Sequence, residues 1–203
     1  MNGWHENPVS TKSGEDSARK RALLSSTLVR KTIVARALIL ATSCFATACL
    51  AADFAAEDPA LLPAPKDVAT VVHADPSFSE FKSGGCLKLV GSKVDLSGDG
   101  RSTDWVVTTA DGCAWGAATA PIWVLRRHST GYSVVLSSGG SDLTVGKGKQ
   151  NGLKHLAIAA GTAGWYSEVL LKYDGTKYVK ARSRQVDLSN PEDCRKNKDV
   201  CPK

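Results

Sequence analysis

The sequence predicts an all-β protein, a small single-domain antiparallel β-sandwich or partial propeller. From about residue 78 to 187, short runs rich in β-branched and aromatic residues alternate with Gly, Asp, Asn and Ser, which is the pattern of strands and turns. No stretch of this region carries a clear helical period. One succession of turn, strand, Gly/Trp loop and hairpin occurs twice, which indicates a fold built from two internal repeats.

The two repeats span residues 99–135 and 151–179. They place two loops that contain glycine and tryptophan, 111–116 and 161–165, at equivalent positions. Short apolar runs bounded by turn residues predict eight strands, near 85–91, 104–109, 121–127, 132–137, 142–146, 154–159, 167–173 and 177–184. About 110 ordered residues are enough to bury one core, so we expect a single β domain over residues 78–187.

The first 77 residues are predicted to lie outside this domain. Residues 1–27 are polar without an apolar face, which predicts a disordered segment or a mis-assigned start. In residues 28–52, basic side chains precede a short apolar run that passes into small residues, the order of a secretory signal peptide. A transmembrane helix needs about 20 consecutive apolar residues, and this run is shorter. Residues 53–77, rich in Ala, Pro and Asp, predict a linker.

Cleavage of the signal is expected after Ala48 or Ala52. Cys49 directly follows Ala48, so a bacterial lipobox with lipid attached to Cys49 is the alternative, and it would anchor the protein to a membrane. The expected location is the periplasm, either free or as an outer-membrane lipoprotein.

Four cysteines remain after the leader, and an even number in an exported domain predicts disulfides. Four cysteines allow three connectivities; proximity in the sequence favours Cys86–Cys113 and Cys194–Cys201. The second pair would staple a basic tail, residues 188–203. A zinc site is disfavoured because the paired cysteine spacing is missing and no histidine is near a cysteine.

The formal charge of +6 resides mostly in the leader, where residues 1–52 hold seven Lys and Arg against three Asp and Glu. The remaining chain is close to neutral. A nucleic-acid-binding domain would show a basic patch with interleaved aromatic residues, so this class is disfavoured.

The segment 95–104 is the sharpest local motif of the chain. Oxygen-bearing side chains stand at its first, third and fifth positions, and a glycine at the sixth makes a sharp turn, as at the start of a calcium loop. The predicted ligands are Asp95, Ser97, Asp99, the backbone carbonyl of Arg101, and Asp104. The alternative is an Asp/Ser/Gly-rich β-turn without a metal.

This motif, followed by the strand that begins Trp105-Val106-Val107, resembles the FG-GAP/VCBS type of repeat. Ser97 replaces the usual Asn, and the final Asp falls one residue late, at Asp104. The wider pattern is similar to small bacterial envelope proteins, some of which are periplasmic inhibitors or immunity proteins against lysozyme-like effectors. The resemblance covers about residues 84–184 and implies a structural calcium ion and a protein partner, a cell-wall hydrolase.

An inhibitor needs a loop that enters a hydrolase cleft. Glycines let the backbone approach closely, and rigid aromatic side chains anchor interfaces. These criteria select a set of candidate partner-binding residues: Trp115, Ser138, Gly139, Gly161, Gly164, Trp165 and Tyr166. Trp105 and Trp123, inside apolar runs, are expected in the core.

Two other function classes are alternatives to an inhibitor. A calcium-stabilised carbohydrate-binding, cell-wall-binding or adhesion module would stack these aromatic rings on sugars. An enzyme is disfavoured because there is no Gly-x-Ser-x-Gly elbow and the histidines at 128 and 155 stand alone. The sequence therefore predicts an exported, non-enzymatic binding protein.

Overall fold

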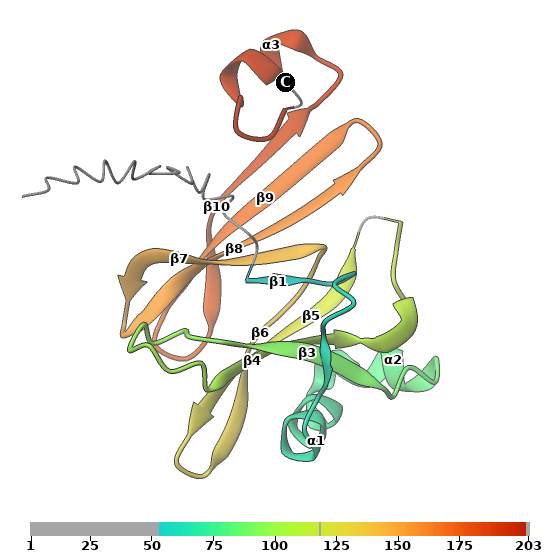
Figure 1. The fold of residues 1–203 in the computed structure, drawn as a ribbon, viewed down its shortest axis with the longest axis vertical. Helices are drawn as coiled ribbons and strands as arrows, with labels where there is room; N and C mark the ends of the chain where they lie inside the picture. Colours follow the sequence, from blue (N-terminus) through green and yellow to red (C-terminus); the bar gives the residue numbers. More distant parts are fainter. Residues whose placement is uncertain (1–52, 118, 202–203) are drawn as a thin grey trace, which may run out of the picture. The chain divides into compact units, whose positions relative to one another are not determined.

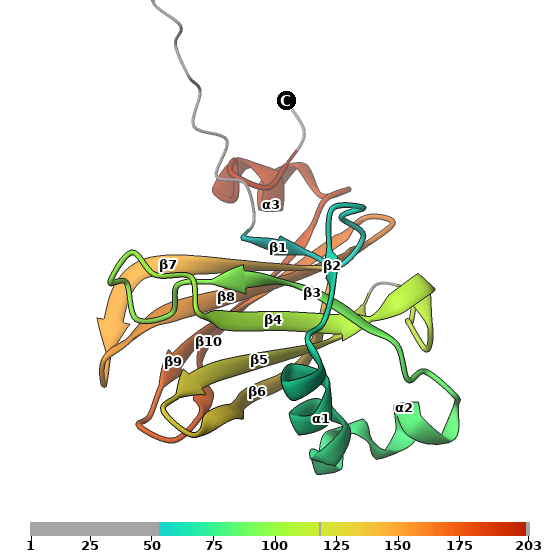
Figure 2. The same ribbon diagram turned by 60° about the horizontal axis from the view of Figure 1, so that its bottom comes forward.

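Ten strands form two antiparallel five-stranded sheets in the computed structural model, which describes residues 53–117 and 119–201 (Figures 1 and 2). The first sheet has the order β2-β3-β4-β5-β6, with bounds Leu62–Pro63, Leu89–Val94, Asp104–Thr109, Ala120–His128 and Gly131–Gly140. The second sheet has the order β1-β7-β8-β9-β10, with bounds Phe54–Ala55, Asp142–Gln150, Leu153–Thr162, Trp165–Tyr173 and Tyr178–Asp187. The predicted all-β sandwich is confirmed. The predictions for residues 1–52, Cys49 included, fall outside the described residues.

Each sheet is a four-stranded meander with a two-residue strand added at its edge. The first proposed repeat supplies β4, β5 and β6, the third to fifth strands of the first sheet, and the second supplies β8, β9 and β10, which hold the same places in the second sheet. The Gly/Trp loops therefore connect corresponding strands, β4 to β5 and β8 to β9. The internal repeat itself stays a prediction.

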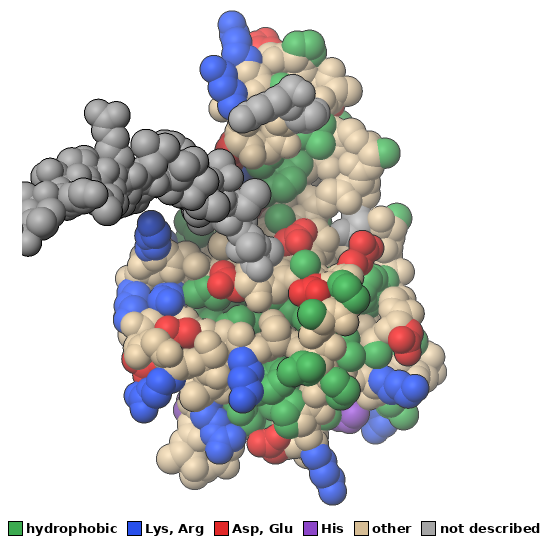
Figure 3. All heavy atoms as spheres, viewed as in Figure 1, with side chains coloured by type: hydrophobic (Ala, Val, Ile, Leu, Met, Phe, Trp, Pro, Cys, Tyr) green, Lys and Arg blue, Asp and Glu red, His purple; other side chains and the backbone are tan. Residues whose placement is uncertain are grey.

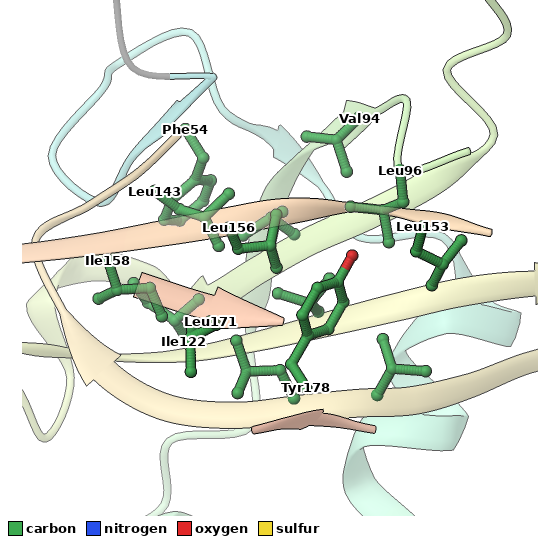
Figure 4. Close-up of a cluster of buried hydrophobic side chains, with 14 of the residues drawn as sticks. Phe54, Val94, Leu96, Ile122, Leu143, Leu153, Leu156, Ile158, Leu171 and Tyr178 are labelled. Carbon is green, nitrogen blue, oxygen red and sulfur yellow. The ribbon is translucent and has the colours of Figure 1, made fainter. Parts of the chain in front are cut away.

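The main core lies between the two sheets (Figure 4). Both sheets contribute aliphatic side chains that are almost fully buried, among them Val106, Ile122, Leu143, Leu156 and Leu171. Burial of one such side chain stabilises the fold by about 1.5–3 kcal/mol, which makes this cluster the dominant favourable term.

A second core lies on the opposite face of the first sheet, under helix α1 (Lys66–Ala74) and the short helices η1 (Pro76–Phe78) and α2 (Ser79–Ser83). Trp105 and Trp123 are 3% and 0% exposed there, so the prediction that both are core residues is confirmed. Because both faces of the first sheet are covered, every residue of β4 is buried. Its polar residues Asp104, Thr108 and Thr109 are buried together with its three apolar ones, Trp105, Val106 and Val107.

The prediction of a linker at residues 53–77 was wrong. Phe54, in β1, belongs to the main core, and Val68 and Val72 of α1 are fully buried against the first sheet. The prolines that argued against a helix precede it, and Pro65 occupies the N-cap position, where its restricted backbone is tolerated. Two buried valines four residues apart make one apolar helix face, too short to show a clear period in the sequence.

Smaller corrections concern both ends of the domain. The first strand was expected at 85–91, but β3 begins at Leu89, because the segment before it is tied to the β4–β5 loop by Cys86–Cys113. The expected tail at 188–203 contains helix α3 (Pro191–Lys196), whose first N–H groups are capped by Asn190. Cys194–Cys201 closes this segment, so both favoured cysteine pairs are confirmed.

Within the described residues, no helix is both long and apolar enough to cross a lipid bilayer.

Candidate binding groove and acidic loop

The first Gly/Trp loop, residues 111–117, is held rigidly against the end of β4. The disulfide Cys86–Cys113 joins it to the segment before β3. Thr109 donates a hydrogen bond from Oγ1 to the carbonyl of Cys113 (2.6 Å) and accepts one from Trp115 Nε1 (2.9 Å). Trp115 is half-buried and packs against the main core, so its ring has both a structural contact and a free face.

The two Gly/Trp loops line one groove, which we call the Thr119 groove. It consists of three adjacent pockets of about 310, 220 and 240 Å³ that share Thr119. The first contains Ser138 and Gly139, the second Trp115 and Gly161, and the third Gly161, Trp165 and Tyr166. Six of the seven predicted partner-binding residues thus line the groove, although they come from three separate segments of the chain. The side chain of Tyr166, however, lies on the opposite face of β9 from that of Trp165.

One wall of the groove is the inner face of the second sheet where it extends past the main core. Trp165 and Ser167 stand two positions apart in β9, in the same series as Val169 and Leu171, so they share the core face of that strand. Gln185 of β10 is paired with Ser167 and also lines the groove. Trp165 is 54% exposed, which leaves most of its ring available for contact.

The groove is acidic. The charged side chains that line it are two carboxylates. Glu57 lines the pocket that contains Trp115, and Glu80 lines the pocket that contains Gly139. Figure 3 shows acidic side chains around β1 and α2, and Lys and Arg side chains toward the β7–β8 turn. The sequence did not point to Glu57, Glu80, Thr119 or Gln185, because each joins the groove only through tertiary contacts.

Gly164 does not line the groove. Its φ of +89° places it in the β8–β9 turn, and its carbonyl accepts a hydrogen bond from the backbone N–H of Leu188 at 2.7 Å. The C-terminal segment is thus bonded to the second Gly/Trp loop, which the sequence did not predict. A contact between residues 24 positions apart leaves no local signal.

The predicted calcium loop connects β3 to β4, and its carboxylates bind protein groups. Asp95 accepts backbone N–H groups from Gly98 (2.6 Å) and Gly100 (3.0 Å), and the hydroxyl of Ser97 (3.2 Å). Asp99 forms an ion pair with Arg101, with Nη2 to Oδ2 at 2.8 Å.

Asp104 differs from the other predicted ligands in that it is buried. It is 4% exposed, and its two oxygens accept the backbone N–H groups of Leu96 (3.2 Å) and Arg127 (2.8 Å). Asp104 thus joins the loop to β5. In the described residues, no cluster of three or more Asp, Glu, His or Cys side chains is arranged to hold a metal ion.

Lysines from the second sheet bring positive charge to this loop. The Lys154 ammonium lies 3.5 Å from Asp95 Oδ2, and a Cβ placed on Gly98 would lie within 3.1 Å of the side chains of both Lys149 and Lys154. Two ammonium groups beside the loop repel a further cation. In the described conformation these lysines neutralise part of the charge of the loop, and calcium binding stays a prediction of the sequence.

The electrostatics of the three carboxyls differ with their surroundings. The ion pair and hydrogen bonds from Arg101 lower the pKa of Asp99 to about 2. For Asp95, partial burial acts to raise the pKa, but the N–H groups of Gly100 and Gly98 and the charge of Lys154 lower it overall. Burial raises the pKa of Asp104 in spite of its two backbone hydrogen bonds.

Comparisons with protein-family models, curated proteins and solved structures give no match to this chain.

Proposed function

We propose that this chain is an exported, non-enzymatic binding protein of the bacterial envelope that inhibits a lysozyme-like cell-wall hydrolase through the Thr119 groove. The proposal is carried by one observation. Three segments distant in the sequence place Gly, Ser and Trp residues around three adjacent pockets that share Thr119. Rigid aromatic side chains beside small residues form the kind of surface at which protein partners are anchored.

The shape and charge of this end of the molecule support a protein partner. The β8–β9 hairpin extends past the first sheet, as Figure 1 shows, and Trp165 is the first residue of β9 after its turn. Glu57 and Glu80 give the groove an acidic lining. Complementary charge accelerates association, so a basic hydrolase is favoured over an acidic one.

This function can be tested by measuring whether the purified full-length protein inhibits cell-wall lysis by a panel of lysozyme-like muramidases. We expect inhibition by the wild type and at least about a tenfold weaker inhibition by Trp165→Ala, the loss typical of an aromatic anchor. Leu62→Ala is the matched control, because Leu62 is 62% exposed and does not line the groove. Equal inhibition by Trp165→Ala and the wild type would refute this role of the groove.

A glycan ligand is the second candidate, and the third pocket favours it. An exposed indole there is surrounded by neutral hydrogen-bonding side chains, Thr162, Ser167 and Gln185. Sugar rings are bound by stacking on such a ring while their hydroxyls bond to amides and hydroxyls. Binding to purified peptidoglycan without inhibition of any muramidase, lost in Trp165→Ala and kept in Leu62→Ala, would support this candidate and reject the first.

A further inference from the structure

The β9–β10 end of the second sheet is covered on its outer face by residues 188–201, which we call the C-terminal cap. The strand pairing sets Val186 opposite Tyr166 and Arg184 opposite Glu168. All four side chains therefore share the face opposite to the one that carries Trp165. Val186 is fully buried although it belongs to neither core, and helix α3 of the cap contacts β10. The cap thus supports the binding hairpin from behind.

Two hydrogen bonds from backbone N–H groups tie the cap to the hairpin and to β10. Leu188 donates its N–H to the carbonyl of Gly164 in the β8–β9 turn (2.7 Å). Asp187, at the end of β10, donates its N–H to the carboxylate of Asp193 in α3 (3.2 Å). The first bond ends on the residue next to Trp165.

Arg184 links the same cap to the aromatic residue beside Trp165. Its Nη2 donates to Glu168 Oε2 (2.8 Å) and to Asp199 Oδ2 (2.7 Å). Tyr166 donates its hydroxyl hydrogen to Glu168 Oε2 (3.1 Å), and the guanidinium carbon lies 5.6 Å from the centre of its ring. Arg184 therefore connects an acid of the cap with an acid and an aromatic ring of the hairpin.

The disulfide Cys194–Cys201 closes the short loop that contains Asp199. Closing a loop removes conformational freedom, so Asp199 meets Arg184 at a lower entropic cost than an open tail would. The ordered cap in turn restricts Tyr166 through its contact with Arg184, and restricts the β8–β9 turn through the hydrogen bond of Leu188 to Gly164.

We propose that the C-terminal cap fixes the position of the β8–β9 turn for partner binding, and that Arg184 is the positioning residue that transmits this restraint. A turn that is already ordered loses less entropy when it binds. The inference rests on the proposed function only for its consequence in binding. Its structural part stands on contacts within the chain.

Hydrogen exchange of the full-length protein, followed by mass spectrometry, tests the structural part without any partner. In Asp199→Asn and in the double variant Cys194→Ser, Cys201→Ser we expect amides of residues 162–167 to exchange about tenfold faster, as loss of one hydrogen bond to a charged group implies. Amides of β4 and β5 should keep wild-type rates. Asp199→Glu should restore slow exchange if the contact with Arg184 is what matters.

Glu192→Gln is the matched control, since it removes a cap carboxylate that pairs with Lys196 at 2.9 Å on the exposed surface of α3. Its exchange pattern should match that of the wild type. Unchanged exchange at 162–167 in both the Asp199→Asn and the double-serine variant would overturn the proposal. If exchange rises as expected but no muramidase is inhibited by the wild type, the proposed function fails while the positioning role stands.

Discussion

At the scale of single residues, Asp104 shows how a predicted metal ligand is used as a structural acceptor. Its carboxylate takes the N–H groups of Leu96 and Arg127, so it joins the β3–β4 loop to β5 inside the protein. The motif indicated a sharp turn with oxygen-bearing side chains, and within that turn Asp95 accepts the N–H groups of Gly98 and Gly100. The motif did not predict which distant donors would reach these side chains, because Arg127 is 23 positions away and Lys154 lies in the other sheet.

Replacement of Asp104 by alanine should destabilise the fold strongly. Two buried or half-buried N–H groups lose their acceptor, at about 1–3 kcal/mol for each, so we expect a loss of roughly 2–6 kcal/mol in the free energy of unfolding by urea. Asp67→Ala is the control, because its exposed carboxylate meets the side chain of the same Arg127 at 3.5 Å. The control should change the free energy by less than about 0.5 kcal/mol. Equal effects of the two variants would contradict the structural role.

The stability difference between the wild type and Asp104→Asn should depend on pH. Burial raises the pKa of Asp104 in the folded state above its unfolded value of 3.8. The folded protein then binds the proton more tightly than the unfolded chain, so the contribution of this group is full below pH 3.8 and is lost as the pH rises through the folded pKa. The advantage of the wild type over Asp104→Asn should thus shrink between pH 3 and pH 7. A growing advantage over that range would mean that the pKa is lowered instead.

At the scale of elements, the β3–β4 loop and the β7–β8 hairpin bind each other through charge and backbone contacts. Besides the ion pair with Asp95, Lys154 donates its N–H to the carbonyl of Leu96 at 2.7 Å, and its carbonyl accepts the hydroxyl of Tyr178 at 2.8 Å. The Asn151-Gly152 dipeptide is a sequence signal for a two-residue hairpin turn, because such a turn needs positive φ at both residues and Asn-Gly tolerates it. Both residues do have positive φ. The contact of that hairpin with the β3–β4 loop has no such signal.

Calcium titration followed by thermal melting tests whether the β3–β4 loop binds calcium or whether its carboxylates bind only protein groups. Because Asp95, Asp99 and Asp104 already have protein partners, we expect millimolar calcium to shift the melting temperature of the wild type by less than about 1 °C, well below the several degrees that 1 kcal/mol produces. A larger rise that disappears in the double variant Asp95→Ala, Asp99→Ala would instead confirm the predicted calcium site.

At the scale of the whole molecule, the sequence predicted the sheets better than it predicted what covers them. Strands such as β4 and β5 follow from local runs of β-branched and aromatic residues between turns. The helices that cover the first sheet, and the pairing of each two-residue strand with β3 or β7, depend on distant contacts that no local pattern encodes. The groove was predictable as a set of Gly and Trp residues, but not its acidic lining or the cap behind it.

The three-layer arrangement of second sheet, first sheet and helix α1 predicts that residues 53–77 are required for folding. Val72 is fully buried against the first sheet, whereas Thr70 is exposed on the same helix. Val72→Asp places an unpaired charge in the second core and should lower the free energy of unfolding by about 3 kcal/mol or more, while Thr70→Asp should change it by less than about 0.5 kcal/mol. Deletion of residues 53–77 from the full chain should expose Trp123 and shift its emission to longer wavelength. A deleted protein with native emission and a wild-type melting temperature would restore the linker and exclude α1 from the domain.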